Sequence, residues 1–354
     1  MTRAPLPTTF KAAVLHRTGA PLAIEDDLEI PPLRRGQLLV RIHYAGVCHS
    51  QLMEARGGRG EDPYLPHLLG HEATGTVLAV GDAVEKLRVG DRVVLGWIRG
   101  QGIDAGGVQY RQGARLINAG AVATFATHAV VSENRCTPLP PTVPADIGVL
   151  LGCAVPTGAG MVLNTLAPTT GQTLAIVGLG GIGLAALLAA RSIDGLRVVA
   201  IDPEAGKRAL AQRLGAEDVF DPAAADFSSR WQAAFPRGVD HCVEAAGTTH
   251  TIELGFSLVR RGGGRCLFAS HPASGESIRI DPYELICGKR IEGSWGGQTQ
   301  PDRDLPRYAA LYAGGRLPLE LLLDRRYRLE DINEALDDLA GRRVTRALIE
   351  ISPP

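Results

Sequence analysis

The sequence predicts an α/β protein of two domains, one rich in β-strands and one built on a parallel sheet. Its 354 residues slightly exceed two typical domain lengths of roughly 100–200 residues each. Up to about residue 172, short apolar runs are separated by Pro and Gly, a pattern typical of strands and turns. Beyond that point, strands alternate with helix-length segments, which predicts βαβ units and a parallel sheet.

The individual elements follow from the same periodicity. In the β-rich part, strands are predicted at 11–15, 37–46, 74–81 and 90–96. The parallel sheet is predicted from strands at 173–179, 197–202, 218–221, 239–247, 263–270 and 289–295, with helical segments at 181–193, 204–215 and 223–235. After Trp295 the elements become shorter again, and the chain closes with a helix at 331–341 and a strand at 346–351.

Composition and charge exclude several classes of partner. Hydrophobic residues make up 45% and charged residues 21% of the chain, as in a soluble globular protein. The 37 Lys and Arg against 38 Asp and Glu leave a net charge of −1, too balanced for a protein that binds nucleic acid or an anionic membrane. We therefore expect a small-molecule partner.

Six cysteines without a C-x-x-C pair are too few for a disulfide scaffold, which favours a reducing compartment. The first residues lack the apolar stretch of a secretory signal, so we expect a cytoplasmic protein. Residues 173–190 are apolar and long enough to span a bilayer. The four glycines within them mark a strand that passes into a helix and argue against a membrane span: Gly178, Gly180, Gly181 and Gly183.

These glycines form G-x-G-x-x-G after the strand at 173–179, the fingerprint of a dinucleotide-binding Rossmann domain, which is doubly wound. The glycines permit the tight turn, the approach of a pyrophosphate and the close packing of the helix. Asp202 ends the second strand, where a carboxylate can bind both ribose hydroxyls of the adenosine and repel a 2′-phosphate. The sequence thus favours NAD over NADP, although Lys207 and Arg208 nearby could accommodate a phosphate.

Three further segments each contribute a side chain that binds transition metals. They are AGVCHS with Cys48, LGHEATG with His71 and LLGCAVPTGAG with Cys153. Two thiolates and one imidazole make the open ligand set of a catalytic zinc, whose fourth position is left for water or substrate. Taken singly, the cysteines also fit small buried residues, and the histidine fits a hydrogen-bonded loop residue.

Together these segments closely resemble the zinc-dependent alcohol dehydrogenases of the medium-chain dehydrogenase/reductase superfamily, nearest the branch of the glutathione-dependent formaldehyde dehydrogenases. The resemblance covers nearly the whole chain. It implies a GroES-like catalytic domain at 1–154 and 295–354 around a Rossmann NAD-binding domain at 155–294, and a homodimer or homotetramer. The matching stretches are AGVCHS, GHEATGTVLAVG, GDRVV, GCAVPTGAG, FATHAVV, VGLGGIGLA, the turn at Asp202 and RALIEI.

The resemblance also implies roles for single residues. Cys48, His71 and Cys153 would bind the zinc, and Glu72 would approach the metal during ligand exchange. Ser50 would take the alcohol proton and pass it toward the nicotinamide ribose. The remaining positions that match family positions are His49 and Arg346 at the pyrophosphate, Thr157 and Ile182 around the nicotinamide, and Trp97 and Trp295 at the pocket or the cofactor wall.

Two departures from the family pattern are informative. No cysteine lies between Cys48 and Cys136, so we expect one catalytic zinc per chain and no structural zinc. The replacing segment, 96–120, must hold itself by packing and hydrogen bonds, and it fits either a mobile segment or a subunit contact. Gln51 replaces an Asp near the metal, which removes a negative charge and lowers the pKa expected for the substrate alcohol. Met53 replaces a relay His and cannot carry protons.

The sequence therefore predicts reversible hydride transfer between an alcohol, most simply a primary one, and NAD. Two alternatives stay open: a zinc-free reductase of activated double bonds or quinones, and a non-catalytic NAD-binding sensor. An acidic substrate or thiol adduct is conceivable because guanidinium groups bind carboxylates, although ordinary solvated surface charge is the favoured explanation of these arginines. The residues concerned are Arg56, Arg59, Arg99, Arg111 and Arg115, with His271 as a further candidate substrate contact.

Overall fold

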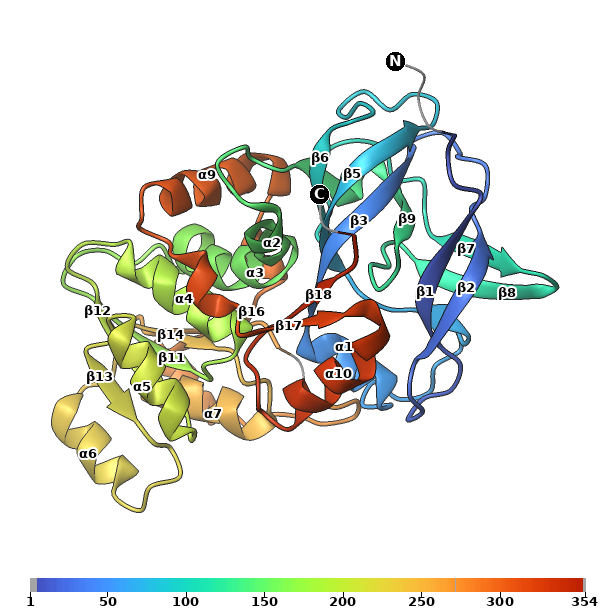
Figure 1. Ribbon diagram of the computed structural model, residues 1–354. Helices are drawn as coiled ribbons and strands as arrows, with labels where there is room; N and C mark the ends of the chain where they lie inside the picture. Colours follow the sequence, from blue (N-terminus) through green and yellow to red (C-terminus); the bar gives the residue numbers. More distant parts are fainter. Residues whose placement is uncertain (1–4, 271, 353–354) are drawn as a thin grey trace. The chain divides into compact units, whose positions relative to one another are not determined.

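The computed structural model describes residues 5–270 and 272–352 and comprises two compact units (Figure 1). Unit 1 consists of Met1–Cys153, Gln300–Ala310 and Leu319–Pro354, and unit 2 of Ala154–Thr299 and Leu311–Pro318. The first predicted boundary, after residue 154, is one residue away from this division. The second differs, because the chain returns to unit 1 at Gln300 rather than at 295, and residues 311–318 belong with unit 2. His271 lies outside the described residues.

Unit 1 is built from a closed barrel and a seven-stranded sheet. The barrel order is β1 (Thr9–Leu15), β2 (Ala23–Glu29), β7 (Val108–Gln112), β8 (Arg115–Gly120) and β4 (His67–Leu68). The sheet order is β10 (Cys136–Pro138), β6 (Arg92–Gly96), β5 (Glu72–Val80), β3 (Gln37–Val47), β18 (Ala347–Glu350) and β17 (Arg325–Arg328), with β9 (His128–Ser132) also paired to β3.

The helices of unit 1 are short. In α10, the buried residues Ile332, Ala335 and Leu336 recur at helical spacing and form its apolar face. The helical segments are α1 (His49–Ala55), α2 (Ala145–Gly148) and α10 (Ile332–Ala340), with the 3₁₀ turns η1 (Glu133–Arg135), η2 (Val149–Gly152), η5 (Leu319–Leu322) and η6 (Leu329–Asp331). Helix α9 (Pro301–Ala313) begins in unit 1 and ends in unit 2.

Unit 2 is a six-stranded sheet in which all neighbouring strands are parallel. This confirms the predicted α/β fold. Its order is β13 (Asp218–Phe220), β12 (Arg197–Ile201), β11 (Thr173–Val177), β14 (His241–Glu244), β15 (Arg265–Phe268) and β16 (Arg290–Gly293). The helical segments are α3 (Ala154–Gly160), the π-helical turn η3 (Met161–Leu166), α4 (Gly181–Arg191), α5 (Ala205–Arg213), α6 (Phe227–Ala234), α7 (Thr249–Leu258), α8 (Pro282–Ile286) and the 3₁₀ turn η4 (Gly296–Gln298).

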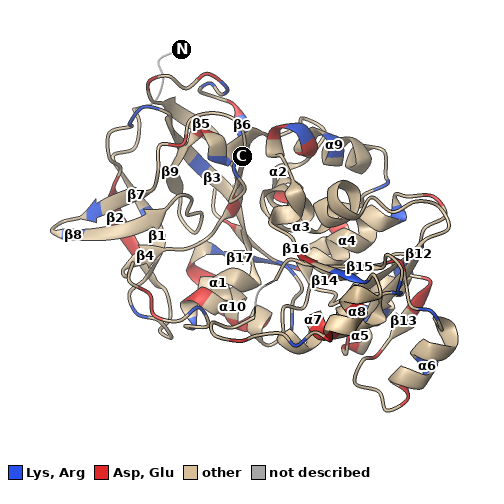
Figure 2. Ribbon diagram, turned by 180° about the vertical axis from the view of Figure 1, so that it is seen from behind, with Lys and Arg blue, Asp and Glu red and all other residues tan. Residues whose placement is uncertain are grey.

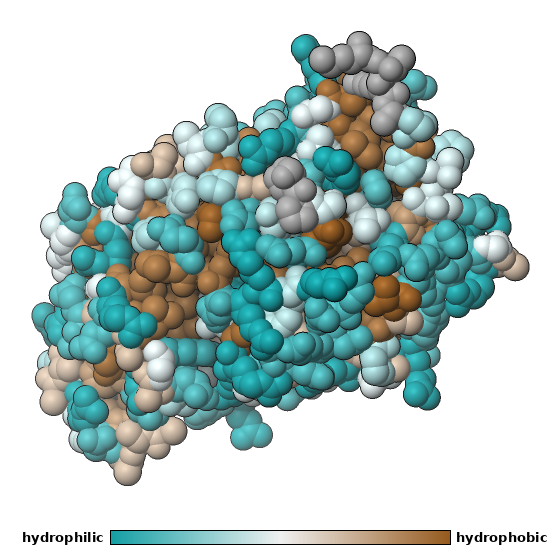
Figure 3. Space-filling view, in the orientation of Figure 1, coloured by the Kyte–Doolittle hydropathy of each residue, from teal (hydrophilic) through white to brown (hydrophobic). Residues whose placement is uncertain are grey.

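The surface agrees with the balanced composition. Acidic and basic residues are interspersed along the chain in Figure 2, and Figure 3 shows hydrophilic side chains over much of one face, interrupted by hydrophobic areas. Among the described residues, no single helix is both long and apolar enough to cross a bilayer. One bent pair, Ala145–Gly152 with Ala154–Leu166, passes that test by length and composition alone, and most of its residues are buried in the protein.

Candidate metal centre

Three chain segments of unit 1 bring the predicted zinc ligands together. Cys48 follows β3 and begins α1, and His71 immediately precedes β5. Strands β3 and β5 are antiparallel neighbours with Ala45 opposite Ala73. Cys48, after the end of β3, and His71, before the beginning of β5, therefore lie at the same end of this strand pair. Cys153 follows η2 and is the last residue of unit 1 before α3.

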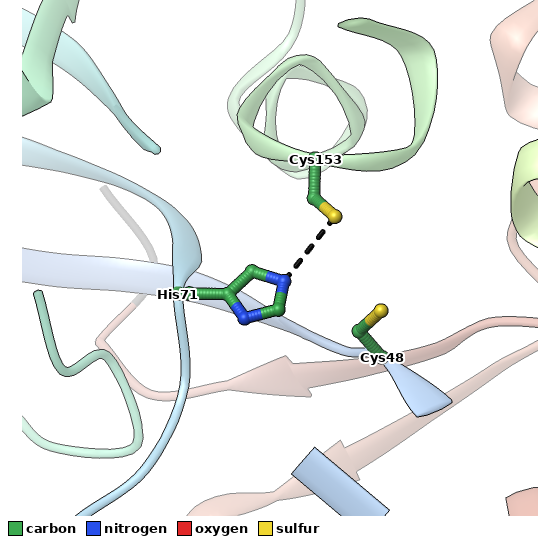
Figure 4. A group of neighbouring side chains, drawn as sticks. All are labelled: Cys48, His71 and Cys153. Carbon is green, nitrogen blue, oxygen red and sulfur yellow. Dashed lines mark hydrogen bonds between the residues drawn. The ribbon is translucent and has the colours of Figure 1, made fainter. Parts of the chain in front are cut away.

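The three side chains point toward one another in Figure 4. Their ligand atoms lie within 4.8 Å of one another, and His71 Nε2 is 3.2 Å from Cys153 Sγ. Both cysteines are buried. A set of two sulfurs and one imidazole nitrogen suits zinc better than the harder divalent cations. The residues present therefore fit a zinc ion with three protein ligands.

The thiols are electrostatically unequal. The Cys153 thiol beside Cys48 holds the pKa of Cys48 well below its usual range. The same contact, together with burial, raises the pKa of Cys153. The first proton therefore leaves Cys48, whereas a bound cation would favour the thiolate of both residues.

Glu72 follows His71 in the sequence, and its side chain is fully buried. Its Oε1 accepts a hydrogen bond from Arg346, and its Oε2 has no partner. Burial raises the pKa of the Glu72 carboxyl. Two glycines make room for the side chain: a Cβ on Gly46 would lie 2.6 Å from the carboxyl group, and one on Gly152 would lie 2.7 Å from Glu72 Cβ.

This arrangement bears on two predicted roles. Glu72 is not part of the three-residue ligand group, and its approach to the metal stays a prediction. Arg346, expected at the cofactor pyrophosphate, is buried against Glu72, and its Nε has no hydrogen-bond partner. The contact with pyrophosphate also stays a prediction. The Glu72–Arg346 pair itself joins residues 274 positions apart, so no local motif could have indicated it.

Gln51 contacts both ligand segments. Its Oε1 accepts the backbone N–H of Cys48 at 2.9 Å, and its side-chain nitrogen lies against Nδ1 of His71. The Gln51 oxygen does not accept an N–H from the imidazole, because it already has a backbone donor. The amide nitrogen donates to Nδ1, and Nε2 of His71 then carries the proton that faces Cys153. Metal binding at Nε2 requires the other tautomer.

Helix α1 carries the other predicted residues of this segment. His49 is exposed, whereas Ser50 is half-buried and its Oγ is a buried atom without a hydrogen-bond partner. Buried hydroxyls normally have a partner. The unpaired Oγ, two residues beyond Cys48, is therefore suited to a hydroxyl supplied by substrate or cofactor.

The fingerprint glycines of unit 2 have the conformations that the motif demands. Gly178 has φ +89°, which favours glycine, and a Cβ on Gly183 would lie only 1.8 Å from the carbonyl oxygen of Gly178. A Cβ on Gly180 would meet nothing within 4 Å. Gly180 therefore faces open space at the beginning of α4, which includes Gly181 and Ile182, and this is where the motif places a pyrophosphate.

Asp202 is buried at the end of β12, and its Oδ2 accepts the backbone N–H of Leu179 at 2.8 Å. The carboxylate is thus joined directly to the fingerprint turn. Arg208 donates to the backbone carbonyls of Asp202 and Pro203, both at 2.7 Å, and pairs with Asp221 at 3.2 Å. Lys207 is half-buried. The Arg208 guanidinium is already neutralised, which fits NAD better than a cofactor with a 2′-phosphate.

The four residues predicted around the nicotinamide and the substrate pocket are divided between the units. Thr157 is buried in α3. A Cβ on Gly158 would lie 2.2 Å from the carbonyl oxygen of Ile182, so α3 and α4 are in close contact. The Trp97 carbonyl accepts a hydrogen bond from Arg135 in unit 1, whereas Trp295 in unit 2 is 80% exposed. The roles of all four predicted positions at the pocket or the cofactor stay predictions.

Glu133, which sequence reasoning missed, anchors the glycine-rich segment at 96–120. Its Oε1 accepts the backbone N–H groups of Glu85 and Lys86 at 2.8 and 2.7 Å, and its Oε2 accepts that of Ile103 at 3.0 Å. A Cβ on Gly102 would lie 2.6 Å from this carboxylate. Residues 108–120 form the β7–β8 hairpin of the barrel. The segment is thus integrated into unit 1.

Four of the five arginines proposed for an acidic substrate form ion pairs within the protein. Arg111 lies on β7 with an exposed side chain. The pairs are Arg56–Asp337 at 2.8 Å, Arg59–Glu54 at 3.1 Å, Arg99–Asp104 at 3.3 Å and Arg115–Glu25 at 2.9 Å. This pairing favours the interpretation as ordinary surface charge.

Comparison with known proteins agrees with the site. The family model described as zinc-binding dehydrogenase matches residues 181–313, and the alcohol dehydrogenase GroES-like domain matches residues 34–141. A geraniol dehydrogenase from Castellaniella defragrans is 34% identical, covering 92% of this chain and 93% of its own. The chain belongs to the zinc-binding alcohol dehydrogenase family. It is therefore an oxidoreductase, and the predicted resemblance is confirmed.

Other members of the zinc-binding alcohol dehydrogenase family are similar over the whole length. An S-(hydroxymethyl)glutathione dehydrogenase from Photobacterium damsela is 30% identical, covering 96% of this chain and 99% of its own. A zinc-binding-domain alcohol dehydrogenase from Burkholderia ambifaria has a TM-score of 0.89 at 30% identity, covering 97% and 98% of the two chains. The benzyl alcohol dehydrogenase of Acinetobacter calcoaceticus has a TM-score of 0.88 at 28% identity, covering 97% and 99%.

Proposed function

We propose that this chain is an NAD-dependent alcohol dehydrogenase that holds one catalytic zinc and interconverts a primary alcohol and its aldehyde. The observation that carries the proposal is the group of Cys48, His71 and Cys153, whose three ligands leave one position of a tetrahedral zinc open. When bound, zinc supplies a Lewis acid for the substrate oxygen and NAD supplies the hydride acceptor.

The chain's own groups orient the reactants and move the proton. Ser50 Oγ accepts the alcohol proton, since it is buried without another partner. Met53 cannot carry that proton onward, so it leaves through ribose hydroxyls and water. Asp202 binds the ribose hydroxyls of the adenosine, and Gly180 leaves room for the pyrophosphate.

For the substrate, we propose a primary alcohol next to an unsaturated or aromatic carbon. The names of two similar proteins, a geraniol dehydrogenase and a benzyl alcohol dehydrogenase, support this class. The ion pairs of the surface arginines give no support to a free cluster that would select a carboxylate. Six free cysteines fit a reducing compartment such as the cytoplasm, and we expect a homodimer or homotetramer.

Metal analysis combined with turnover tests the proposal. We expect about one zinc per chain and NAD reduction that a chelator abolishes. Active protein without zinc would support the double-bond reductase instead, and bound zinc and NAD without turnover of any alcohol would support the sensor. The mass of the oligomer by light scattering decides between dimer and tetramer.

A matched pair of substrates tests the alcohol class. We expect higher kcat/KM for benzyl alcohol than for 4-(hydroxymethyl)benzoate, which differs only by the carboxylate. Combined alanine substitution of Arg99, Arg111 and Arg115 should leave this preference unchanged. A preference for the carboxylate that the triple substitution removes would contradict the proposed class.

A further inference from the structure

A second group of metal-binding side chains lies outside the catalytic centre. Glu54, Asp62 and His67 each offer one ligand atom, and these atoms lie within 4.8 Å of one another. Glu54 lies near the end of α1, Asp62 in the following loop, and His67 at the beginning of β4. The group therefore links the segment that begins at Cys48 with the one that leads to His71.

The hydrogen bonds of His67 define which of its nitrogens carries a proton. The side chain is 7% exposed, and Nδ1 lies 3.0 Å from the carbonyl oxygen of Leu68. A carbonyl oxygen only accepts, so Nδ1 must donate. In the neutral ring, Nε2 then presents a lone pair, and this lone pair is directed into the group. A metal-bound histidine shows this same arrangement, with the remote N–H held by a backbone carbonyl.

The surroundings of Nε2 require a cation. Asp62 Oδ2 is 2.8 Å from Nε2, and Glu54 Oε1 is 3.9 Å from it. The Tyr64 backbone N–H holds Asp62 Oδ1 at 3.0 Å and so directs Oδ2 toward His67. Despite burial, that N–H and the His67 ring keep the pKa of Asp62 below its usual range, so the carboxylate is ionised at neutral pH. A lone pair that faces two carboxylates is repulsive unless positive charge lies between them.

A proton and a metal ion would satisfy this group differently. A proton on Nε2 reaches Asp62 only, because 3.9 Å to Glu54 is too long for a hydrogen bond. A metal ion with octahedral bonds of about 2.1 Å holds neighbouring ligand atoms about 3.0 Å apart, so it can bind all three atoms once Glu54 moves inward by about 1 Å. Arg59 donates to Glu54 Oε2 at 3.1 Å and leaves Oε1 available.

We propose that Glu54, Asp62 and His67 form a second metal site, which binds a divalent cation of the Mn²⁺ type. Ligand atoms 2.8 Å apart on such an ion subtend nearly a right angle, which suits octahedral coordination completed by water better than a tetrahedron. Carboxylate and water ligands suit Mn²⁺, whereas the two thiolates of the catalytic centre disfavour it. The bound ion ties α1 to β4 across residues 56–66 and so stabilises unit 1.

Titration of the zinc-loaded, full-length enzyme with Mn²⁺ tests the site, with free Mn²⁺ followed by its paramagnetic resonance signal. We expect one saturable Mn²⁺ per chain in addition to the catalytic zinc. His67→Gln and Asp62→Asn should each weaken this binding at least about tenfold, as loss of a ligand does. Glu54→Gln should also weaken it, and because the Glu54 side chain is 29% exposed this variant is expected to fold normally. Mn²⁺ should raise the unfolding temperature of the wild type but not of His67→Gln.

His16→Gln is the matched control, because His16 pairs with Glu25 at 2.5 Å and is not part of this group. Its Mn²⁺ affinity should equal that of the wild type. The proposal is overturned if no saturable Mn²⁺ binds, or if the affinity is the same in Glu54→Gln and His67→Gln as in the wild type. Nitrogen NMR signals of the His67 ring that stay sharp in excess Mn²⁺ would show that the ion binds elsewhere and would also overturn the proposal.

Discussion

At the metal centre, a neutral side chain bridges two ligand segments. Gln51 accepts the backbone N–H of Cys48 through its oxygen and holds the His71 ring through its nitrogen. A carboxylate in this place would add a negative charge beside the ligand imidazole, whereas the amide adds none. Gln51 is buried, so water screens this difference only weakly.

Gln51→Glu should therefore shift the pH profile of alcohol oxidation upward. The added charge disfavours loss of the substrate proton and raises its pKa, by roughly 0.5–1 unit for a neighbouring buried charge. Steady-state kcat/KM measured from pH 6 to 10 gives the shift. Gln51→Asp should move in the same direction, and an unchanged or lower midpoint in both variants would contradict the interpretation.

Ser50 provides a second prediction at the scale of a single group. Removing the hydroxyl by Ser50→Ala should lower kcat about 10²- to 10⁴-fold, the usual contribution of a positioned proton acceptor. Ser50→Thr should restore most of the rate, because it keeps the oxygen. NADH affinity by fluorescence titration serves as the control, and a kcat for Ser50→Ala close to that of the wild type would exclude Ser50 from the proton path.

Among the elements, the segment at 96–107 is held in place by hydrogen bonds to one carboxylate, that of Glu133. Burial alone would raise the pKa of Glu133, but three backbone N–H groups hold it below its usual range. Glu133 therefore stabilises the fold at pH values above its unfolded pKa of about 4.3, and this stabilisation is lost as the pH falls toward the lowered folded value.

Glu133→Gln should destabilise the protein by about 1–3 kcal/mol at pH 7, because an amide N–H₂ replaces one acceptor and leaves a backbone donor unpaired. Thermal unfolding from pH 7 to about pH 3 should show a constant difference from wild type at high pH, which shrinks once the pH falls below the unfolded carboxyl pKa of about 4.3. Glu85→Gln is the control, because the Glu85 side chain is exposed and only its backbone N–H contacts Glu133. Equal unfolding temperatures of Glu133→Gln and wild type at pH 7 would show that the anchor is unimportant.

Periodicity predicted the elements that bury regular apolar stripes and missed those that do not. Strands β3, β5 and β11 and helices α4 and α10 lie where apolar spacing placed them. Strand β2 was missed because AIEDDLE is mostly charged. The β7–β8 hairpin is hidden among glycines, and α9 carries Pro306 inside the helix, a residue that usually ends one.

The candidate sites show the same limit. The grouping of Cys48, His71 and Cys153 and the glycine fingerprint could be predicted because each lies in a local motif that resembles a known family. The Glu72–Arg346 pair, the Glu133 anchor and the second metal group could not, because each joins segments that no short motif connects. Contacts of this kind depend on strand register and loop geometry, which cannot be read from a short stretch of sequence.

At the scale of the whole molecule, the candidate metal site and the dinucleotide fingerprint belong to separate units. The predicted zinc ligands Cys48, His71 and Cys153 all belong to unit 1, whereas Asp202 and the fingerprint glycines belong to unit 2. Each unit also has a hydrophobic core of its own. Metal and cofactor binding should therefore be separable.

Removing the zinc should abolish turnover while NADH affinity stays within about twofold, as expected for independent sites. Fluorescence titration of the chelator-treated enzyme measures this affinity, and reconstitution with Zn²⁺ provides the control by restoring activity. Loss of NADH binding together with the metal would mean that the metal also organises unit 2.

The narrow space around Glu72 has a consequence for how this sequence can drift over evolutionary time. A Cβ on Gly46 would meet the end of the Glu72 side chain, so positions 46 and 72 must change together. A Cβ on Gly152 would meet the Leu95 carbonyl oxygen at 2.5 Å and the Cβ of residue 72, so Gly152 is fixed whatever the length of that side chain. Gly46→Ala alone should be rejected, whereas Gly46→Ala combined with the shorter Glu72→Asp relieves the crowding. Chains descended from a common ancestor should accordingly show size-compensating covariation at positions 46 and 72, a signature of packing rather than of catalysis.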